Sequence, residues 1–330
     1  MSDLYPLLMQ PLFDPRPWGT LDLSPIYSQT FKEKIGESWL TGDDCKIQNG
    51  SLAGKSLSEL ALQFQRTLVG DAAPNAERFP LLAKFLFPHE KLSVQVHPDD
   101  ADARAIGQPW GKTECWYVAH AEARAEIGLG LKAGTTRAQF EKAIHENRAE
   151  ELLNWIKVSA GDLIYVAGGT VHTLGPGSII VETQQQSDTT FRLYDYGRPR
   201  ELHLKGGLRV IKEQVASGKV KPQSFAKFGS NGNRVRPLVA APYFVVEKFE
   251  LHGAQEFDVE NRTKSSAQVL VAASGTAKLE AQGHDPVRFG KGDAVVIPAA
   301  IRKFKIVPET EIEFLQSYVP GEKVSPPEIV

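Results

Sequence analysis

The chain has 330 residues, of which 42% are apolar and 24% charged, the balance of a globular protein with roughly two domains. Its net charge of −2 at pH 7 lacks the basic excess typical of nucleic-acid-binding proteins. It shows no signal-peptide pattern, and no apolar run reaches the roughly 18 residues that a membrane helix needs. Two distant cysteines, Cys45 and Cys115, predict no disulfide framework. We therefore expect a cytosolic protein without a membrane or nucleic-acid partner.

Short strand-like segments separated by turns recur along the chain, which carries 28 glycines and 21 prolines. Several of them alternate apolar and polar residues, as strands with one buried face do. The pattern predicts a mainly β protein. The expected strands are Leu92–Val96, Cys115–Ala119, Leu163–Ala167, Ile179–Thr183, Phe191–Tyr196, Tyr243–Phe249, Val269–Ala273, Ala294–Pro298 and Ile312–Tyr318.

Three segments interrupt this pattern with helical signals. Ser56–Gly70 begins at a serine cap, has Glu59 at the capping-box position and ends at a glycine. Thr136–Ile156 has an apolar spacing compatible with two short helices, the first of them capped by Thr136. A third helix is expected over Gly207–Ser217.

Two stretches look like copies of one β unit. GDLIYVAGGTVH ends at His172 and GDAVVIPAAIRK ends at Lys303, and both contain Gly-Asp, an apolar strand and a small-residue turn. The repeat predicts two related barrels, of which only the first has a metal-binding residue at the final position. We expect a first domain at 1–217, a linker rich in Lys, Gly, Asn and Pro at 218–237, and a degenerate second barrel at 238–330.

Three segments of the first domain carry side chains suited to a metal ion. Gln95 and His97 are two residues apart in SVQVH, so their side chains emerge on one face of a strand. Glu114 begins a strand in GKTECWYV, and His172 follows a strand and a turn. Two imidazole nitrogens and two oxygens suit Zn²⁺ with an open coordination position. Each residue taken alone is also compatible with an ordinary surface or strand position.

The strings LSVQVHPDD, GKTECWYV, GTVH and ETQQQSDTTFRLYDYGR resemble the signature segments of type I mannose-6-phosphate isomerases, especially the shorter bacterial branch. The resemblance runs from about Pro11 to Ser217 and is mainly architectural beyond that point. It implies two cupin-like (jelly-roll) β-barrels with a few helices, and one Zn²⁺ per chain. The implied zinc ligands are Gln95, His97, Glu114 and His172. One departure is Ala167, where the family usually has proline, and it removes no ligand.

The resemblance also implies the reaction, a reversible interconversion of mannose 6-phosphate and fructose 6-phosphate. A proton moves between C1 and C2 through an enediolate, which a Zn²⁺ Lewis acid would stabilise. Glu182 lies in an apolar strand, where a carboxylate needs a polar cavity or a partner, and it is a candidate acid/base or half of a structural ion pair. Lys112, two residues before Glu114, is a second catalytic candidate, and a metal-bound water is a third candidate for the group that moves the proton. Arg192 is the expected phosphate or transition-state cation.

Three further residues are expected to contact the substrate. Lys84 lies in a mostly apolar run and needs a charge partner, which a bound anion or a salt bridge would supply. Ser93 shares its strand face with Gln95 and would donate to the phosphate. Arg198 is either a second phosphate ligand or a surface charge.

Two alternatives remain beside this prediction. One is another metal-dependent cupin enzyme, such as an iron dioxygenase or a different sugar-phosphate isomerase, although Gln95 and the nearby cations argue against oxygen chemistry. The other is a non-catalytic sugar-phosphate-binding cupin, because one fold hosts many functions. The expected partner is a small-molecule sugar phosphate, and the chain is expected to be a monomer or a weak homo-oligomer.

Overall fold

The computed structural model describes residues 4–259 and 266–330, and most of its regular structure is β-strand. The strands of the first barrel are β2 (Leu12–Asp22), β3 (Thr30–Trp39), β4 (Leu81–Leu86), β5 (Val94–Val96), β6 (Glu114–Ala121), β7 (Glu126–Leu131), β8 (Leu153–Lys157), β9 (Leu163–Val166), β10 (His172–Leu174), β11 (Ser178–Gln185), β12 (Phe191–Tyr194) and β13 (Gly218–Lys219). The strands of the second barrel are β1 (Leu7–Leu8), β14 (Ala226–Lys227), β15 (Arg234–Ala240), β16 (Val245–Leu251), β17 (Gln255–Asp258), β18 (Gln268–Ser274), β19 (Thr276–Glu280), β20 (Val287–Gly290), β21 (Ala294–Ile297), β22 (Lys303–Pro308) and β23 (Ile312–Tyr318). The α-helices are α1 (Leu57–Phe64), α2 (Arg66–Val69), α3 (Asp100–Ala105), α4 (Arg137–His145) and α5 (Leu204–Val210).

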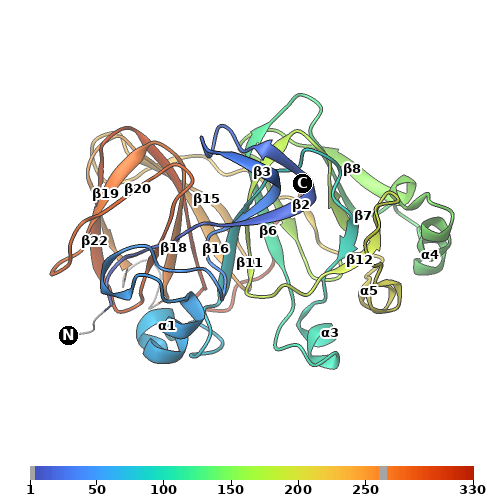
Figure 1. The fold of residues 1–330 in the computed structure, drawn as a ribbon, viewed down its shortest axis with the longest axis horizontal. Coiled ribbons are helices and arrows are strands. Elements are labelled where there is room, and N and C mark those ends of the chain that lie inside the picture. The colour runs from blue at the N-terminus through green and yellow to red at the C-terminus, as the bar shows by residue number, and fades with distance from the viewer. Residues whose placement is uncertain (1–3, 260–265) are drawn as a thin grey trace.

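The two barrels lie side by side, and the helices lie around their periphery (Figure 1). In the first barrel, a seven-stranded sheet with the order β13-β9-β6-β11-β4-β3-β2 faces a five-stranded sheet with the order β12-β5-β10-β7-β8. In the second barrel, the seven-stranded sheet β1-β21-β18-β23-β16-β15-β14 faces the four-stranded sheet β17-β22-β19-β20. The mainly β, two-barrel fold predicted from the sequence is therefore confirmed.

The two seven-stranded sheets pack against each other through a shared hydrophobic core. Phe85 and Val181 of the first barrel belong to the same buried cluster as Val246 and Val269 of the second. Side chains alternate along each strand, so the neighbours of these residues point the other way, into their own barrel. Lys84 and Glu182 stand at such positions, beside Phe85 and Val181. The shared core therefore turns their polar side chains into the interior of the first barrel.

The ends of the chain cross between the barrels. β1, near the N-terminus, pairs with β21 of the second barrel through Leu7 and Val296. At the other end, Ile329 forms a β-bridge with Val220, just after β13 of the first barrel. β13, β14 and the start of β15 also lie within the expected linker at 218–237. The division into 1–217, 218–237 and 238–330 stays a prediction. The structure shows in addition that the N-terminal strand pairs within the second barrel and that the C-terminal end pairs with the first.

The helices follow their local sequence signals at the N-terminal ends. The Ser56 hydroxyl accepts from the Glu59 backbone N–H while the Glu59 carboxylate accepts from the Ser56 N–H, so the predicted capping box of α1 is confirmed. Thr136 and Gln139 form a second capping box at α4. Within the described residues, no helix has both the length and the apolar character required to span a bilayer.

Two helix predictions are wrong in part. The second helix expected before Ile156 is only a 3-10 turn, Ala149–Leu152, and the chain continues as β8 because Ile156 pairs with Ile127 of β7. The helix expected over Gly207–Ser217 is α5, which begins earlier and ends at Val210. There the N–H of Lys212 donates to the carbonyl of Gly169, which takes the chain out of the helix. In both cases tertiary pairing outweighed a weak local preference.

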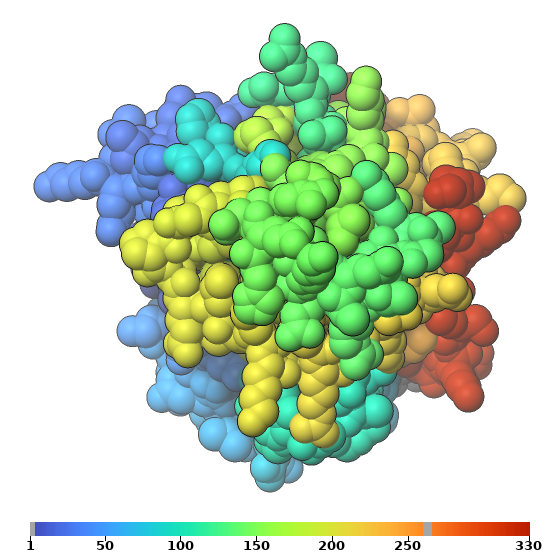
Figure 2. Space-filling model, turned by 90° about the vertical axis from the view of Figure 1, so that its right-hand side faces the viewer, coloured from blue at the N-terminus to red at the C-terminus, as the bar shows by residue number. Residues whose placement is uncertain are grey.

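Aromatic side chains fill the interior of the second barrel. Phe249 and Phe314 stack with their ring centroids 5.1 Å apart, and Phe257 and Phe304 stack at 4.9 Å. Lys303, which occupies the repeat position of His172, is exposed and lies 3.5 Å from the Asp258 carboxylate. Figure 2 faces the outer end of the first barrel, where the α4 region (green) and the segment running through α5 (yellow) cover the surface.

Candidate metal centre and substrate pocket

A cavity of about 440 Å³ lies between the two sheets of the first barrel. Its wall combines side chains from both sheets, β2 included, with side chains from the segments on either side of β12, and many of them are charged. The charged and polar lining residues are Arg16, Glu37, Lys84, Ser93, Gln95, Lys112, Glu114, His172, Glu182, Asp188, Thr190, Arg192 and Arg200.

The register of the sheets explains why these side chains meet. In the five-stranded sheet, Arg192 pairs with Gln95, and Gln95 pairs with His172. In the seven-stranded sheet, Glu182 pairs with Lys84. Directly paired residues of antiparallel strands have their side chains on the same face. Each sheet therefore presents a row of polar groups to the cavity.

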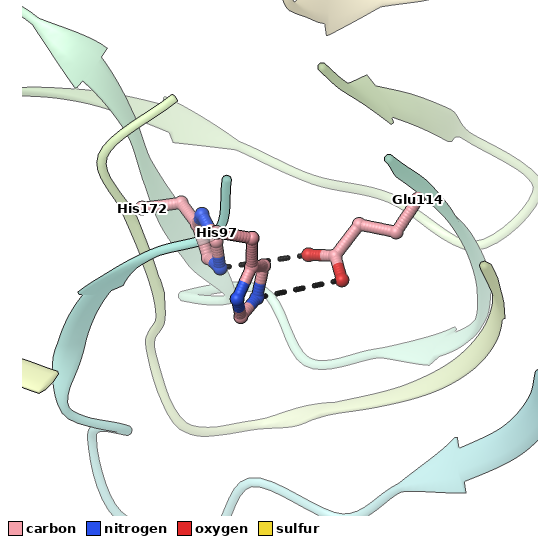
Figure 3. A group of neighbouring side chains, drawn as sticks. All are labelled: His97, Glu114 and His172. Carbon is pink, nitrogen blue, oxygen red and sulfur yellow. Dashed lines mark ion pairs between the residues drawn. The ribbon is translucent and has the colours of Figure 1, made fainter. Parts of the chain in front are cut away.

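His97, Glu114 and His172 form a buried cluster whose ligand atoms all lie within 4.8 Å of one another. The Glu114 carboxylate lies 3.6 Å from His97 Nε2 through one oxygen and 3.5 Å from His172 Nε2 through the other (Figure 3). His97 directly follows β5, and the other two residues begin β6 and β10. Three segments far apart in the sequence thus bring a metal-binding donor set to one point.

Two glycines allow this convergence. A Cβ on Gly111 would lie 2.6 Å from the carbonyl oxygen of Pro98, and a Cβ on Gly168 would lie 2.6 Å from Cα of Asp99. Such distances exclude any side chain larger than that of glycine. The GKTE and GGTVH turns can therefore pack directly on the residues that follow His97.

Each histidine is held with Nε2 as the unprotonated nitrogen. His97 Nδ1 donates to the Thr189 carbonyl at 3.1 Å, and His172 Nδ1 donates to the Thr170 carbonyl at 2.9 Å. A carbonyl oxygen only accepts, so Nδ1 carries the proton and Nε2 keeps its lone pair. Burial lowers the pKa of His172 to about 4. Burial, followed by the Lys112 ammonium, lowers the pKa of His97 well below its usual range. Both rings are thus neutral at pH 7, as metal ligands must be.

Gln95 is the neighbour of the cluster in the five-stranded sheet. Its amide nitrogen lies 3.2 Å from His172 Nε2, and its amide oxygen lies 3.5 Å from the Ser93 hydroxyl. Half a turn of the amide exchanges the nitrogen and the oxygen at almost no cost in shape. The four residues implied as metal ligands by the sequence are thus together in one place, with Gln95 able to present its oxygen to a cation.

A chain of buried charges links the cluster to β4 and β11. Lys112 Nζ lies 2.5 Å from Glu114, 3.0 Å from His97 Nε2 and 3.4 Å from Glu182. Lys84 Nζ lies 3.6 Å from the same Glu182 carboxylate. Burial, and next the Glu114 charge, raise the pKa of Glu182 above its usual value. Glu182 is thus a carboxylate held between two ammonium groups with an enhanced affinity for a proton.

Comparisons with known proteins agree with this geometry. Residues 25–142 match the catalytic domain of type I phosphomannose isomerase, and residues 235–319 match the cupin domain of mannose-6-phosphate isomerase. The mannose-6-phosphate isomerase ManA of Bacillus subtilis is 34% identical over 318 residues, which cover 91% of this chain and 95% of ManA. The chain belongs to the type I mannose-6-phosphate isomerase family. The family, the enzyme class and the fold predicted from the sequence are thus confirmed.

Further relatives place the whole chain in the same family. The mannose-6-phosphate isomerase of Streptococcus mutans is 32% identical, with 93% of this chain and 96% of that protein covered. The crystal structure of the Bacillus subtilis mannose 6-phosphate isomerase has a TM-score of 0.83 and 30% identity, over 94% of this chain and 99% of that one. A mannose 6-phosphate isomerase structure described as zinc-bound shares the fold, with a TM-score of 0.73 at 15% identity.

The remaining residues predicted to bind substrate in this mannose-6-phosphate isomerase differ in whether they line the cavity. Arg192, Ser93 and Lys84 line the cavity. Arg198 does not, because its guanidinium donates to the Lys91 carbonyl at 2.6 Å and pairs with Asp195. The partner that buried Lys84 was expected to need is provided within the protein by Glu182 and Glu37.

Four charged cavity residues of this isomerase were missed in the sequence. They are Arg16, Glu37, Asp188 and Arg200. Glu37 lies two residues before Trp39, so both side chains emerge on one face of β3, and the Trp39 indole N–H donates to the Glu37 carboxylate at 2.8 Å. Nothing in the local sequence separates Arg200 from Arg198, two residues earlier in the same turn.

Glu37 provides a pH-dependent prediction for this isomerase. Burial acts to raise its pKa, but the Lys84 ammonium at 3.1 Å and the Arg16 guanidinium at 3.0 Å lower the pKa of Glu37 from 4.5 to about 2. A depressed carboxyl pKa stabilises the fold above the unfolded value of 4.5, and this contribution is lost as the pH falls towards 2. This contribution to the free energy of unfolding is about 3 kcal/mol.

We expect Glu37→Gln to unfold at a lower urea concentration than the wild type at pH 7, and this difference to shrink at pH 3. An equal difference at both pH values would contradict this account.

Proposed function

We propose that this chain interconverts mannose 6-phosphate and fructose 6-phosphate with one Zn²⁺ per chain, held by Gln95, His97, Glu114 and His172. The observation that carries the proposal is the buried convergence of two histidine Nε2 atoms and a carboxylate within 4.8 Å. Two imidazoles with oxygen donors suit Zn²⁺, whereas an all-oxygen set would suit Mg²⁺ or Ca²⁺. The zinc-bound relative named above gives independent support for the choice of metal.

The protein side chains around the metal centre would do the proton chemistry. A Zn²⁺ bound there would polarise the sugar carbonyl as a Lewis acid. Glu182 takes the proton from one of the two carbons C1 and C2 and returns it to the other, since its raised pKa makes it a stronger base than an exposed carboxylate. Lys112, 3.4 Å from Glu182, donates a hydrogen bond to the sugar oxygen that gains charge.

Other cavity residues would hold and orient the sugar phosphate. Arg192 supplies a cation from the strand next to Gln95, and Ser93 offers a hydroxyl on the same sheet. Lys84 is held by Glu37 and Glu182, so we assign it to positioning Glu182 and to the electrostatics of the sugar site. A cytosolic location and a monomeric or weakly associated state stay predictions from the sequence.

Removal and return of the metal test this function. We expect dialysis against a chelator to abolish the conversion of fructose 6-phosphate in a coupled assay, and one equivalent of Zn²⁺ to restore it. Magnesium added to the same sample is the control, and it should restore nothing because it prefers oxygen ligands. Full activity in the metal-free protein would contradict the proposal. So would tightly bound iron in a protein with no isomerase activity.

A further inference from the structure

Three arginines from separate segments line one part of the cavity. Arg16 comes from β2, Arg192 from β12 and Arg200 from the turn after β12. Burial, and next the charge of Arg200, lower the pKa of Arg192, and Arg16 also contributes. The charges that act most on Glu182 are different ones, namely Glu114, Lys112, Lys84 and Glu37. The cavity thus has two adjoining electrostatic regions that meet at Glu37, a proton-transfer region around Glu182 and an arginine cluster formed by Arg16, Arg192 and Arg200.

We propose that Arg16 and Arg200 close around the phosphate dianion of the substrate, together with Arg192, and so determine the preference for phosphorylated sugars. The proposal rests on the proposed function and adds two residues that carry its substrate selectivity. Guanidinium groups offer forked donors that match phosphate oxygens, and three of them in one cavity repel each other unless an anion lies between them.

Arg200 is aimed by a buried carboxylate. Asp195, whose side chain is 0% exposed, accepts from Arg200 Nε at 2.6 Å and from Nη2 at 2.8 Å. This two-point contact fixes the plane of the guanidinium and uses only one edge of it. The side chain remains 22% exposed, so its outer N–H groups face the cavity and solvent. Asp195 is therefore a positioning residue for Arg200.

Arg16 is carried by a bulge in β2. Pro15 and Thr20 both pair with Ile35 of β3, so residues 16–19 leave the ladder and project over the cavity. The bulge lies tightly on Gly36, where an added Cβ would be 2.5 Å from Cβ of Arg16.

The side chain of Arg16 is held by two carboxylates, where Arg200 has one. Its Nε donates to Glu37 at 3.0 Å, and its Nη1 and Nη2 lie 2.9 Å and 2.5 Å from the two oxygens of Asp14. It is 30% exposed, which leaves donors for a ligand.

Arg192 lacks the carboxylate partner that the other two arginines have. Among the described residues it forms no ion pair, and its Nε is buried without a hydrogen-bond partner. Its Nη1 donates to the Glu201 carbonyl at 2.8 Å. Asp188 lines the same cavity, and its negative charge attracts Arg16. Arg16 therefore also offsets the repulsion between Asp188 and a bound phosphate. A partly buried cation that forms no ion pair in the described part of the chain, in the same cavity as two oriented guanidiniums, creates a strong requirement for an anion.

The test uses Arg16→Gln and Arg200→Gln, with Arg148→Gln as a matched control. Arg148 is an exposed arginine paired with Glu151 on the surface, outside the cavity. We expect each cavity variant to raise the KM for mannose 6-phosphate roughly ten- to hundredfold, the loss expected for charged hydrogen bonds. The inhibition constant of inorganic phosphate should rise by a similar factor, while kcat changes less than about threefold because uniform binding is lost. The control should match the wild type, and Arg200→Lys should fall in between because it keeps the charge without the fork.

Two results would overturn the proposed phosphate clamp, meaning the binding of the phosphate by Arg16, Arg192 and Arg200. One is an unchanged KM and phosphate inhibition in both cavity variants. The other is a fall in kcat with unchanged phosphate inhibition, which is what a purely structural role of Arg16 or Arg200 would produce. Calorimetric titration with inorganic phosphate separates the clamp from the reaction. A wild type that binds phosphate in an Arg16-dependent way without isomerising sugars would refute the proposed function and support the clamp.

Discussion

Replacement of His97 by alanine is expected to remove the metal and to lower kcat/KM by about a thousandfold or more. His97 supplies one of the two Nε2 atoms in the buried cluster, and its Nδ1 is already committed to the Thr189 carbonyl. Alanine leaves one histidine, one carboxylate and the neutral amide oxygen of Gln95, a weaker donor set for Zn²⁺ than the complete one. Elemental analysis of the purified variant and a fructose 6-phosphate assay measure both losses.

His252→Ala is the matched control for this experiment. His252 lies on the surface of the second barrel, where Nδ1 is 2.9 Å from the Glu311 carboxylate. Its removal should leave zinc content and turnover unchanged. If His97→Ala retained stoichiometric zinc and normal turnover, the metal centre would be placed wrongly.

Glu182→Gln is expected to lower kcat by roughly two to four orders of magnitude while the metal remains bound. Glutamine keeps the shape of the side chain but cannot take a proton, so the exchange of the substrate C2 hydrogen with solvent should slow by the same factor. The KM should change little because Glu182 is placed at the reacting carbons rather than at the arginine cluster. Proton–deuterium exchange followed by NMR, together with the coupled assay, separates proton transfer from binding.

Glu250→Gln controls for the loss of a buried carboxylate. Glu250 lies in the second barrel, 3.0 Å from Lys248 and away from the cavity. It should lose stability but keep kcat. Normal exchange in Glu182→Gln, combined with loss of exchange in Lys112→Met, would move the role of the base from Glu182 to Lys112.

The strands were predictable because their apolar residues repeat with the period of a half-buried sheet. Glu182 is a useful example, since a carboxylate within IIVET signals a polar interior on that face. The pairing of Gln95 with both Arg192 and His172 could not be predicted, because it depends on the register of strands that are far apart in the sequence. The resemblance to a known family, rather than local spacing, indicates that the four metal-site residues belong together.

The missed residues share a physical cause. Arg16 reaches the cavity only because of an irregular bulge against Gly36, and such bulges leave little trace in hydrophobic periodicity. Arg200 and Arg198 both contact Asp195, but Arg198 also donates to the Lys91 carbonyl, whereas Arg200 lines the cavity. Charge and residue type are visible in a sequence, but the direction of a long, flexible side chain is set by partners that only the folded chain provides.

The shared metal ion is tested most directly by anomalous diffraction at the zinc edge from crystals of the zinc-loaded protein. The account predicts one peak per chain, about 2.0–2.2 Å from Nε2 of His97, Nε2 of His172, a Glu114 oxygen and the Gln95 amide oxygen. A peak at another location, or no peak in fully active protein, would contradict it.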